Sequence, residues 1–417
     1  MKKITIALLL QLIAGLAIAQ NHKVNDAQAA KFVKYYNDGR PDSIYTLLSE
    51  AGKAKVPLAG VSSALVQLKG ALGKLVSQEY YKPISNGGDS YIAVFEKSGP
   101  VLYLSFNKEN KLTGFFTNVD ERQAPGSVTI KTADAELKGT LTVPDGAGKV
   151  PVVLIIAGSG PTDRNGNTMS LDMKPNTYLM MADAFKTAHI ATLRYDKRMI
   201  GQSTATKDQS QTTFEDMIND AVACIKFLKA DDRFSKIIIA GHSEGSLIGM
   251  IACQRERVDG FISLAGAGFP VDDILKRQIK VNTPLSYNKV APIIDSIKAG
   301  QKIQQKLDPG FENLFGTSLQ TYMHSLFQYK PAVEIAKLTV PTLIVQGSTD
   351  IQVGLQDAFS LNTAKRDAKV QIIDGMSHIL KAGAADKQQN AATYFKSDLP
   401  LHPELMPTLV SFIRSIK

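Results

Sequence analysis

The spacing of apolar and polar residues changes along the chain and divides it into two regions. Up to about residue 120, apolar positions first recur with helical spacing and then alternate in short runs bounded by turn residues. The pattern predicts helices at Ala27–Tyr36, Ser43–Leu48 and Leu58–Leu75, and strands at Tyr91–Phe95, Val101–Phe106 and Leu112–Thr117. Helices followed by a meander of strands indicate a small α+β domain over residues 21–120.

After a linker that contains Pro125, strand and helix patterns alternate. Most of the strands are unbroken apolar runs, which is typical of a parallel sheet covered by helices on both faces. The expected strands are Val128–Lys131, Leu137–Val143, Val152–Ala157, Ile190–Arg194, Ile237–Ala240, Phe261–Ala265, Thr342–Gln346 and Val370–Ile373, with helices at Tyr178–Lys186 and Phe214–Leu228. The pattern therefore predicts an α/β domain over residues 126–417. Residues 268–330 interrupt the alternation with helical and polar sequence, and we expect them to form a lid over the carboxyl ends of the strands.

The segment around Ser243 has the pattern of a nucleophilic serine. An apolar strand leads into Gly241, Ser243 and Gly245, which form Gly-x-Ser-x-Gly, and an apolar helix follows. Such a strand-to-helix turn exposes the hydroxyl and brings the residues two before and two after the serine close together, so glycine is needed at both. We predict that Ser243 is the nucleophile; the alternative is a glycine-rich turn without chemistry.

Two later strands end in residues that suit a general base and its partner. Asp350 follows one predicted strand and His378 follows the next, which gives the chain order serine, acid, histidine. We predict that His378 moves the proton of Ser243 and that Asp350 orients the imidazole. Asp374 is a competing carboxylate, but it lies only four residues before His378. His242, beside the nucleophile, is expected to face away and to serve in packing.

An acyl-transfer site also needs hydrogen-bond donors for the negatively charged oxygen of the tetrahedral intermediate. The backbone N–H of Glu244, directly after the nucleophile, is one predicted donor. The second is expected in the glycine-rich turn after an apolar strand, from Ser159 or, as the near alternative, from Gly160. A phosphate-binding loop is the rival interpretation of these glycines, but neither of the usual nucleotide-binding patterns is present there.

Composition narrows the classes of function. The formal net charge of the chain is +9. The lysines and arginines are interleaved with acidic residues, so no basic block indicates nucleic-acid binding. The two cysteines, Cys224 and Cys253, lie in apolar helical patterns, and we expect free thiols, although an exported chain could join them as a disulfide. No cluster of residues has the spacing of metal ligands, so neither a metal nor a cofactor is expected.

Residues 1–19 have the pattern of a secretory signal peptide. Two lysines precede an uncharged, mostly apolar run from Ile4 to Ala19, which ends in small-x-small at Ala17–Ala19. A membrane anchor is the alternative, but the run is short for a spanning helix and polar sequence follows. We expect cleavage before Gln20 and an exported protein without a stable membrane anchor, periplasmic or extracellular.

Several strings of sequence together resemble the α/β-hydrolases, in particular the bacterial EstD-type carboxylesterases. They are Gly158–Asn167, Arg194–Arg198 with Gly201–Ser203, Gly241–Gly245, Val345–Val353 and Ser377–His378. The resemblance implies an eight-stranded sheet, a helical lid, ester hydrolysis without a cofactor and a small N-terminal α+β domain. One residue departs from the family pattern: Met199 stands where a glycine is common, and we expect it to change the local backbone path and reshape the pocket entrance.

The sequence therefore predicts an exported serine carboxylesterase that acts through an acyl-enzyme on a small-molecule ester. The alternatives are a serine peptidase or aminopeptidase of the same fold and, less favoured, an inactive binding protein. Aromatic residues of the lid either line an acyl pocket or pack within the lid itself. The N-terminal domain carries no catalytic constellation, and we expect it to pack beside the active-site entrance or to form a homodimer contact. The alternative is an independent, tethered domain.

Overall fold

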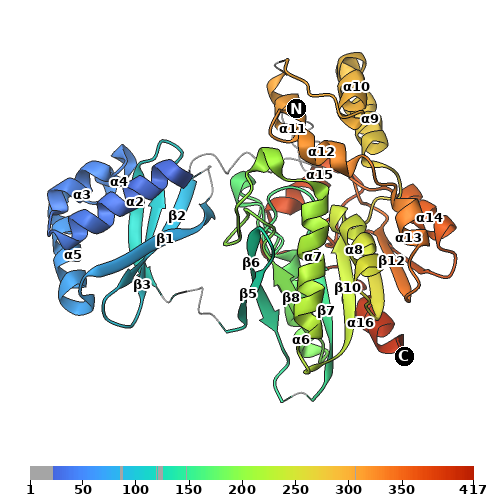
Figure 1. The fold of residues 1–417 in the computed structure, drawn as a ribbon, viewed down its shortest axis with the longest axis horizontal. Helices are drawn as coiled ribbons and strands as arrows, with labels where there is room; N and C mark the ends of the chain where they lie inside the picture. The colour runs from blue at the N-terminus through green and yellow to red at the C-terminus, as the bar shows by residue number, and fades with distance from the viewer. Residues whose placement is uncertain (1–21, 85–87, 119, 121–124, 147, 306) are drawn as a thin grey trace.

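The computed structural model describes residues 22–84, 88–118, 120, 125–146, 148–305 and 307–417. The predicted signal peptide, residues 1–19, lies outside the described residues. The chain forms an N-terminal domain and a larger domain that lie side by side (Figure 1). Of the helices within the described ranges, none is both long enough and apolar enough to cross a membrane.

The N-terminal domain packs helices on one face of an antiparallel sheet (Figure 1). Its helices are α2 (His22–Asn37), α3 (Pro41–Leu47), α4 (Glu50–Lys55) and α5 (Leu58–Leu72), and its strands, in sheet order, are β1 (Leu75–Ile84), β2 (Gly88–Phe95), β3 (Val101–Phe106) and β4 (Leu112–Asn118). Alternation along β2 separates the two faces: Tyr91, Ala93 and Phe95 join the core beneath the helices, whereas Ile92 packs on the other face.

Strand β1 is a correction to the sequence-based expectation of three strands and a helix that reaches Leu75. The helix ends at Leu72 because Gly73 adopts a φ of 83°, a left-handed conformation that glycine tolerates. Polar residues are frequent in the strand that follows, and its pairing with β2 has two irregularities in register. The strand is therefore specified by pairing with β2 rather than by a regular local alternation.

The larger domain is built on a mostly parallel sheet, as expected. Its main path runs β13-β12-β11-β10-β7-β8-β6-β5, eight strands, and the two-residue strand β9 pairs with β6. The strands are β5 (Ser127–Lys131), β6 (Ala135–Thr142), β7 (Val150–Ile156), β8 (Ala191–Tyr195), β9 (Thr204–Ala205), β10 (Phe234–His242), β11 (Gly260–Leu264), β12 (Thr342–Gly347) and β13 (Lys369–Ile373). The antiparallel pairs within the described part of this sheet all involve β6, which pairs with β5, β8 and β9.

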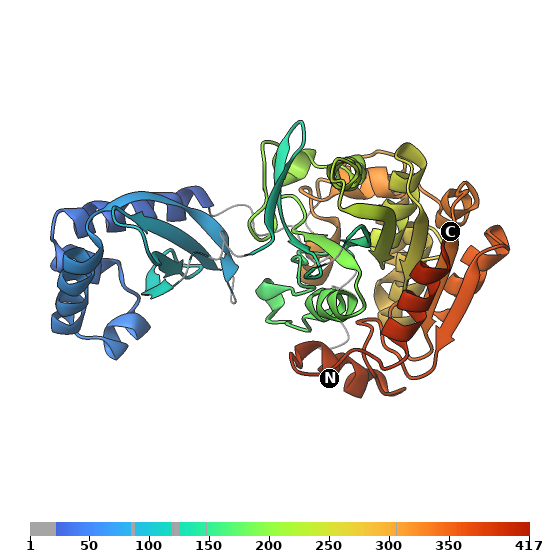
Figure 2. The same cartoon turned by 90° about the horizontal axis from the view of Figure 1, so that it is seen from below.

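Helices cover both faces of this sheet (Figures 1 and 2). They are α6 (Thr177–Thr187), α7 (Phe214–Lys229), α8 (Glu244–Arg255), α13 (Pro331–Ala336), α14 (Leu355–Ala364), α15 (Lys387–Ala392) and α16 (Leu405–Ser415), with short 3₁₀ helices η2 (Met169–Leu171), η3 (Gln209–Gln211) and η4 (Thr393–Phe395). Alternate residues of β7 serve the two layers. Leu154 and Ile156 pack with α7 and α8, whereas Val153 and Ile155 pack with α6 and α16.

The segment between β11 and β12 forms the helices expected of a lid. They are α9 (Val271–Asn282), α10 (Pro284–Lys298), α11 (Pro309–Phe315) and α12 (Gln320–Leu326). The hydroxyl of Tyr322 on α12 donates to the carboxylate of Glu244, the first residue of α8, at 2.9 Å. The lid therefore lies over the carboxyl end of β10. Of its aromatic side chains, Phe315, Tyr322 and Phe327 are buried, and they belong to the same apolar core as α7 and α8.

Candidate active site

Ser243 occupies a strained turn between β10 and α8. Its φ and ψ are 55° and −121°, a conformation that few residues other than glycine adopt. A Cβ atom on Gly241 would lie 2.2 Å from the carbonyl oxygen of Gly245, and one on Gly245 would lie 2.3 Å from that of Ile156. Both glycines of the pattern are therefore required by the space around the turn.

His378 and Asp350 are brought together from the ends of two adjacent strands. Asp350 follows β12, His378 follows β13, and His378 Nδ1 lies 2.8 Å from Asp350 Oδ2. The other oxygen of Asp350 accepts the backbone N–H groups of Gln352 and Val353, at 2.8 and 2.9 Å. Asp374, the competing carboxylate, instead accepts the hydroxyl of Ser348 at 2.7 Å. The structure thus gives Asp350 the contact with the imidazole.

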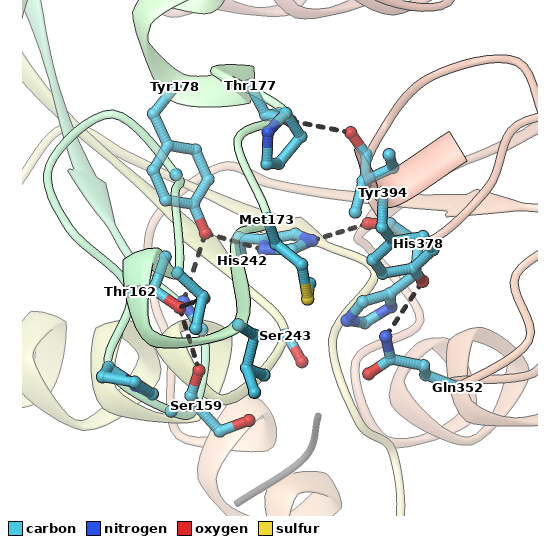
Figure 3. Close-up of a pocket in the computed structure, with 18 residues that line it drawn as sticks. Ser159, Thr162, Met173, Thr177, Tyr178, His242, Ser243, Gln352, His378 and Tyr394 are labelled. Carbon is cyan, nitrogen blue, oxygen red and sulfur yellow. Dashed lines mark hydrogen bonds between the residues drawn. The ribbon is translucent and has the colours of Figure 1, made fainter. Parts of the chain in front are cut away.

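A cavity of about 70 Å³ joins the residues singled out in the sequence (Figure 3). We call it the catalytic cavity; Ser243, His378 and Ser159 all line it. Its apolar lining comes from the loop before α6 and from the segment after His378: Leu171, Met173, Pro175, Ile379 and Tyr394. No direct hydrogen bond between the Ser243 hydroxyl and the His378 ring is among those that the described residues form, so the two groups face the cavity without closing on each other.

His242 corrects the expectation that it faces away. It lines the catalytic cavity, is 7% exposed, and its ring lies 4.9 Å from that of His378, centroid to centroid. Its Nε2 lies 2.8 Å from the backbone oxygen of His378, and its Nδ1 lies 2.8 Å from the hydroxyl of Tyr178. Position next to the nucleophile was the only sequence signal, and it did not indicate which way the ring would point.

These contacts fix how the protons of His242 are arranged. A carbonyl oxygen can only accept, so Nε2 donates to His378 and Nδ1 accepts from the hydroxyl of Tyr178. The same hydroxyl oxygen accepts the backbone N–H of Gly158 at 3.2 Å. Burial and the neighbouring His378 lower the pKa of His242 to about 3, which keeps the ring neutral. A chain of hydrogen bonds therefore connects the turn after β7 to the loop that carries His378.

The two predicted oxyanion donors lie on neighbouring backbone segments. Glu244 begins α8, where the first N–H groups have no partner within the helix. Ser159 and Gly160 lie in the turn after β7, and this turn is bound by Lys197. Lys197 lies within the Arg194–Arg198 string, but the sequence predicted no role for it. Lys197 Nζ donates to the carbonyl oxygen of Gly158 at 2.6 Å and also to that of Gly160.

A second, smaller cavity of about 30 Å³ lies on the Lys197 side of this turn. We call it the lysine cavity. It is lined by Ser159, Gly160, Lys197, Arg198, Ile200, Met217, Glu244 and Tyr322. Burial raises the pKa of the Glu244 carboxyl, and the nearby Lys197 ammonium opposes this change. Of the lid aromatics considered from sequence, Tyr322 is the one that lines either cavity within the described residues.

Met199 has a backbone conformation that is unusual for a methionine. Its φ is 61°, in the left-handed region that glycine adopts readily, so methionine follows the backbone path that a glycine favours there. Neither cavity described above includes Met199 in its lining. The structure therefore gives Met199 no place in the lining of either cavity, and its effect on the pocket entrance stays a prediction. Across the described ranges, acidic, histidine and cysteine side chains form no group of three or more that could hold a metal ion.

Comparison with known proteins agrees with this architecture. The sequence profile of the Hydrolase_4 family, described as serine aminopeptidase S33, matches residues 174–382, half of the chain. The chain belongs to this family. It is a serine hydrolase with the α/β-hydrolase fold. Over 381 residues it is 24% identical to Esterase EstD of Thermotoga maritima, which covers 86% of this chain and 88% of that protein.

Solved structures that are similar to the chain include two esterases. Est1E from Butyrivibrio proteoclasticus has 19% sequence identity and a TM-score of 0.44, and the match covers 70% of this chain and 100% of that one. An esterase from Pyrococcus furiosus, PF2001, has 13% identity and a TM-score of 0.47, with coverage of 72% and 94%.

Proposed function

We propose that this protein is an exported carboxylesterase that hydrolyses small-molecule esters through an acyl-enzyme on Ser243. The observation that carries the proposal is a single cavity lined by Ser243 and by a histidine whose Nδ1 is bonded to the buried Asp350. The turn of Ser159 borders the same cavity and supplies backbone N–H groups. These are the parts that an acyl transfer requires: nucleophile, base and oxyanion donors.

The acylation step follows from this arrangement. Because Nδ1 of His378 is bonded to Asp350, Nε2 is the ring nitrogen that takes the proton of the Ser243 hydroxyl. Ser243 Oγ attacks the ester carbonyl carbon, and the carbonyl oxygen becomes an oxyanion held by the N–H groups of Glu244 and Ser159. When the intermediate collapses, His378 returns its proton to the departing alcohol, and the acyl group remains on Ser243.

Deacylation repeats the same chemistry with water. His378 Nε2 takes a proton from a water molecule, whose oxygen attacks the acyl carbon of the ester on Ser243. A second oxyanion forms and collapses, the proton passes to Ser243 Oγ, and the carboxylic acid leaves. The hydrogen bond from His378 Nδ1 to Asp350 keeps the ring in one tautomer and stabilises its positive charge through both steps. No cofactor takes part in either step.

Replacement of the nucleophile tests the proposal. Ser243→Ala should lower the hydrolysis of p-nitrophenyl butyrate by at least about 10³-fold, because the oxyanion donors alone retain only a small part of the rate enhancement. Ser415→Ala, at the end of α16, is the matched control and should keep wild-type activity. A fluorophosphonate should label wild type and Ser415→Ala but not Ser243→Ala. Activity of Ser243→Ala near the wild-type level would contradict the assignment.

A serine aminopeptidase is the second candidate, because that is how the family is described. The same groups cleave amides, although an amine leaving group depends more on protonation by His378 than an alcohol does. Turnover of an aryl ester should be compared with turnover of an aminoacyl arylamide that has the same acyl group. We expect ester turnover to be much faster; comparable or faster amide turnover would favour the peptidase.

The location of the protein is part of the proposal. Support comes from residues 1–19, whose lysines, apolar run and small-x-small ending suit a cleaved signal peptide. Expression of the full chain in a bacterium, followed by fractionation, should place the enzyme in the periplasm or medium with Gln20 as its first residue. A cytoplasmic enzyme that retains Met1 would contradict export and leave the esterase proposal unaffected.

A further inference from the structure

Lys197 is a buried cation that the catalytic steps above do not use. It lies just after β8, is 8% exposed, and its ammonium group donates to the carbonyl oxygens of Gly158 and Gly160. Burying an ammonium group is costly unless it is paired or hydrogen-bonded. Here the ammonium donates hydrogen bonds to two carbonyl oxygens of one turn. That turn borders the lysine cavity and also the catalytic cavity.

The direction of these carbonyls fixes the direction of a neighbouring N–H group. In a trans peptide unit the C=O and N–H bonds point in opposite directions. The carbonyl of Gly158 belongs to the same peptide unit as the N–H of Ser159. Since that carbonyl points at Lys197, the Ser159 N–H points away from Lys197 and from the lysine cavity. The opposite side of the turn is the catalytic cavity, where Ser243 and His378 lie.

The next peptide unit is turned the other way. The carbonyl oxygen of Ser159 accepts the hydroxyl of Thr162 at 3.1 Å, and Thr162 lines the catalytic cavity but not the lysine cavity. The N–H of Gly160, in that same unit, therefore points away from Thr162. Of the two candidates left open by the sequence, Ser159 has the N–H that is directed to the nucleophile side.

We propose that Lys197 is a positioning residue of the oxyanion hole. By binding the carbonyls of Gly158 and Gly160, it holds the Gly158–Ser159 peptide unit with the Ser159 N–H directed at the oxygen that becomes charged during acyl transfer. This inference rests on the proposed function, because an oxyanion forms only if Ser243 attacks a carbonyl or related centre. It concerns the geometry of one donor and assigns Lys197 no contact with the substrate.

The surroundings of Lys197 determine how its charge responds to pH. The Glu244 carboxylate faces it from α8, and Tyr322 on the lid donates to that carboxylate. Its neighbour Arg198 is engaged elsewhere, with Asp134 and Asp220. Burial lowers the pKa of Lys197 to about 8, although Glu244 opposes the change. Loss of the proton above this pH weakens both charge-assisted hydrogen bonds to the turn.

The first experiment removes the ammonium group and keeps the length of the side chain. Lys197→Met should lower kcat by about tenfold to a hundredfold with KM changed little, because one oxyanion donor is misaligned rather than deleted. Inhibition by benzeneboronic acid, which forms a tetrahedral adduct on the serine, should weaken by a similar factor. The matched control is Lys365→Met, which removes another buried ammonium bonded to a backbone carbonyl, that of Leu338, far from the site.

The second experiment uses the conservative replacement and pH. The lysine cavity beside Lys197 offers room for Lys197→Arg, which keeps the donors and stays charged at every accessible pH. The released acid should be titrated between pH 6 and 10. Wild-type kcat should fall as the pH rises through about 8, whereas Lys197→Arg should retain most of the activity at neutral pH and lose the alkaline decline.

The outcomes separate this inference from the proposed function. Inactive wild type on all esters would defeat the proposed function. If wild type is active and Lys197→Met differs from it by less than twofold in kcat and in boronate inhibition, the role of Lys197 is overturned. The proposed esterase function is then unaffected. The role would also be overturned if Lys197→Met and Lys365→Met lost equal amounts of kcat, each in proportion to its loss of stability. It would likewise be overturned if an active Lys197→Arg kept the fall of kcat at alkaline pH.

Discussion

The two domains of this protein bury different kinds of side chain. Within the described residues, the buried positions of the N-terminal domain are mainly aromatic and aliphatic, and its buried polar residues are few: Asn25, Ser43, Asp89, Ser90 and Asp120. The catalytic domain buries two histidines beside Ser243 and also the cations Lys197 and Arg198. Arg198 is 1% exposed and pairs with Asp220 at 2.7 Å, which is equally buried.

The difference shows where the fold accepts an energetic cost. A buried charge or imidazole destabilises the folded state unless hydrogen bonds satisfy it, and it then fixes the positions of the groups that it binds. In the catalytic domain these groups hold the turn of Ser159 and the loop of His378. The N-terminal domain also holds polar groups by hydrogen bonds, from Asn25 to the buried Asp89 at 2.7 Å and from Tyr91 to Asp26 at 2.6 Å, but none of these residues lines the catalytic cavity.

The domains nevertheless meet near the active site. A polar cavity of about 220 Å³ is lined by β1 residues, including Tyr80 and Tyr81, and by catalytic-domain residues, including Lys138 and Arg164. Arg164 belongs to the loop after Ser159 and pairs with Asp196 at 2.6 Å. Strand β1 also contacts η2, whose Leu171 lines the catalytic cavity. The N-terminal domain is therefore placed to influence the shape of that cavity but supplies none of its lining among the described residues.

The largest loss of activity is expected when the carboxylate that bonds His378 is replaced. Asp350→Asn should lower kcat by about 10³- to 10⁴-fold, because an amide can no longer hold the required tautomer or stabilise the imidazolium. Asp374→Asn is the matched control; its carboxylate bonds Ser348, so activity should stay within about threefold of wild type. Both variants should be assayed with p-nitrophenyl butyrate at neutral pH. A larger loss in Asp374→Asn than in Asp350→Asn would reverse the assignment.

An intermediate effect is expected from the hydrogen bonds of His242. In His242→Gln the side chain can still donate to the His378 carbonyl, but it no longer presents the ring nitrogen that accepts from Tyr178. We expect kcat to fall by about tenfold and KM to change little, because the loop of His378 loses a fixed position. Steady-state kinetics on the same ester check this expectation. Wild-type kcat in the variant would show that the connection to Tyr178 does not serve catalysis.

The same substitution should change how stability depends on pH. In the unfolded chain His242 titrates near its ordinary value of 6.5, whereas in the folded protein it stays neutral down to about pH 3. Between these values the unfolded state binds more protons, so the free energy of unfolding falls as the pH drops, by about 2 kcal/mol at pH 5 for this group. Urea unfolding at several pH values should give His242→Gln a flatter dependence than wild type. Identical slopes would mean that His242 has the same pKa in the folded protein as in the unfolded chain.

The smallest effect is expected from removal of the N-terminal domain. A chain that begins at Gly126 keeps every residue of the catalytic cavity and of the hydrogen bonds behind it. We expect kcat on small esters within about tenfold of wild type, with a larger change in KM for bulky alcohols, because β1 no longer supports η2. Assays across a series of alcohols, with gel filtration to compare oligomeric state, provide the measurement. A truncated protein that folds but is inactive would contradict the view that the catalytic domain alone carries the catalytic groups. Unchanged kinetics and an unchanged oligomeric state would show that the N-terminal domain has no role at the site.

Much of the architecture could be predicted because it follows from local periodicity. Unbroken apolar runs such as those of β7 and β10 indicate strands buried on both faces, whatever lies beyond them. The strand β1 escaped prediction because its polar residues and register irregularities hide the alternation. It becomes a strand only when β2 pairs with it. Met199 shows the same limit, since its left-handed backbone is imposed by the surrounding loop and not by its own preference.

The sequence by itself determined the nucleophile position and its order relative to Asp350 and His378. The steric demand on Gly241 comes from Gly245, within the same five residues, so it is visible in the chain, whereas the demand on Gly245 comes from the carbonyl oxygen of Ile156 in β7. The partners of His242 and Lys197 were decided only by the tertiary structure. Their hydrogen bonds reach Tyr178, His378 and Gly158, which are between 39 and 136 residues away. Local patterns report periodicity and backbone sterics, whereas the partner of a buried polar side chain is chosen by the packing of distant segments.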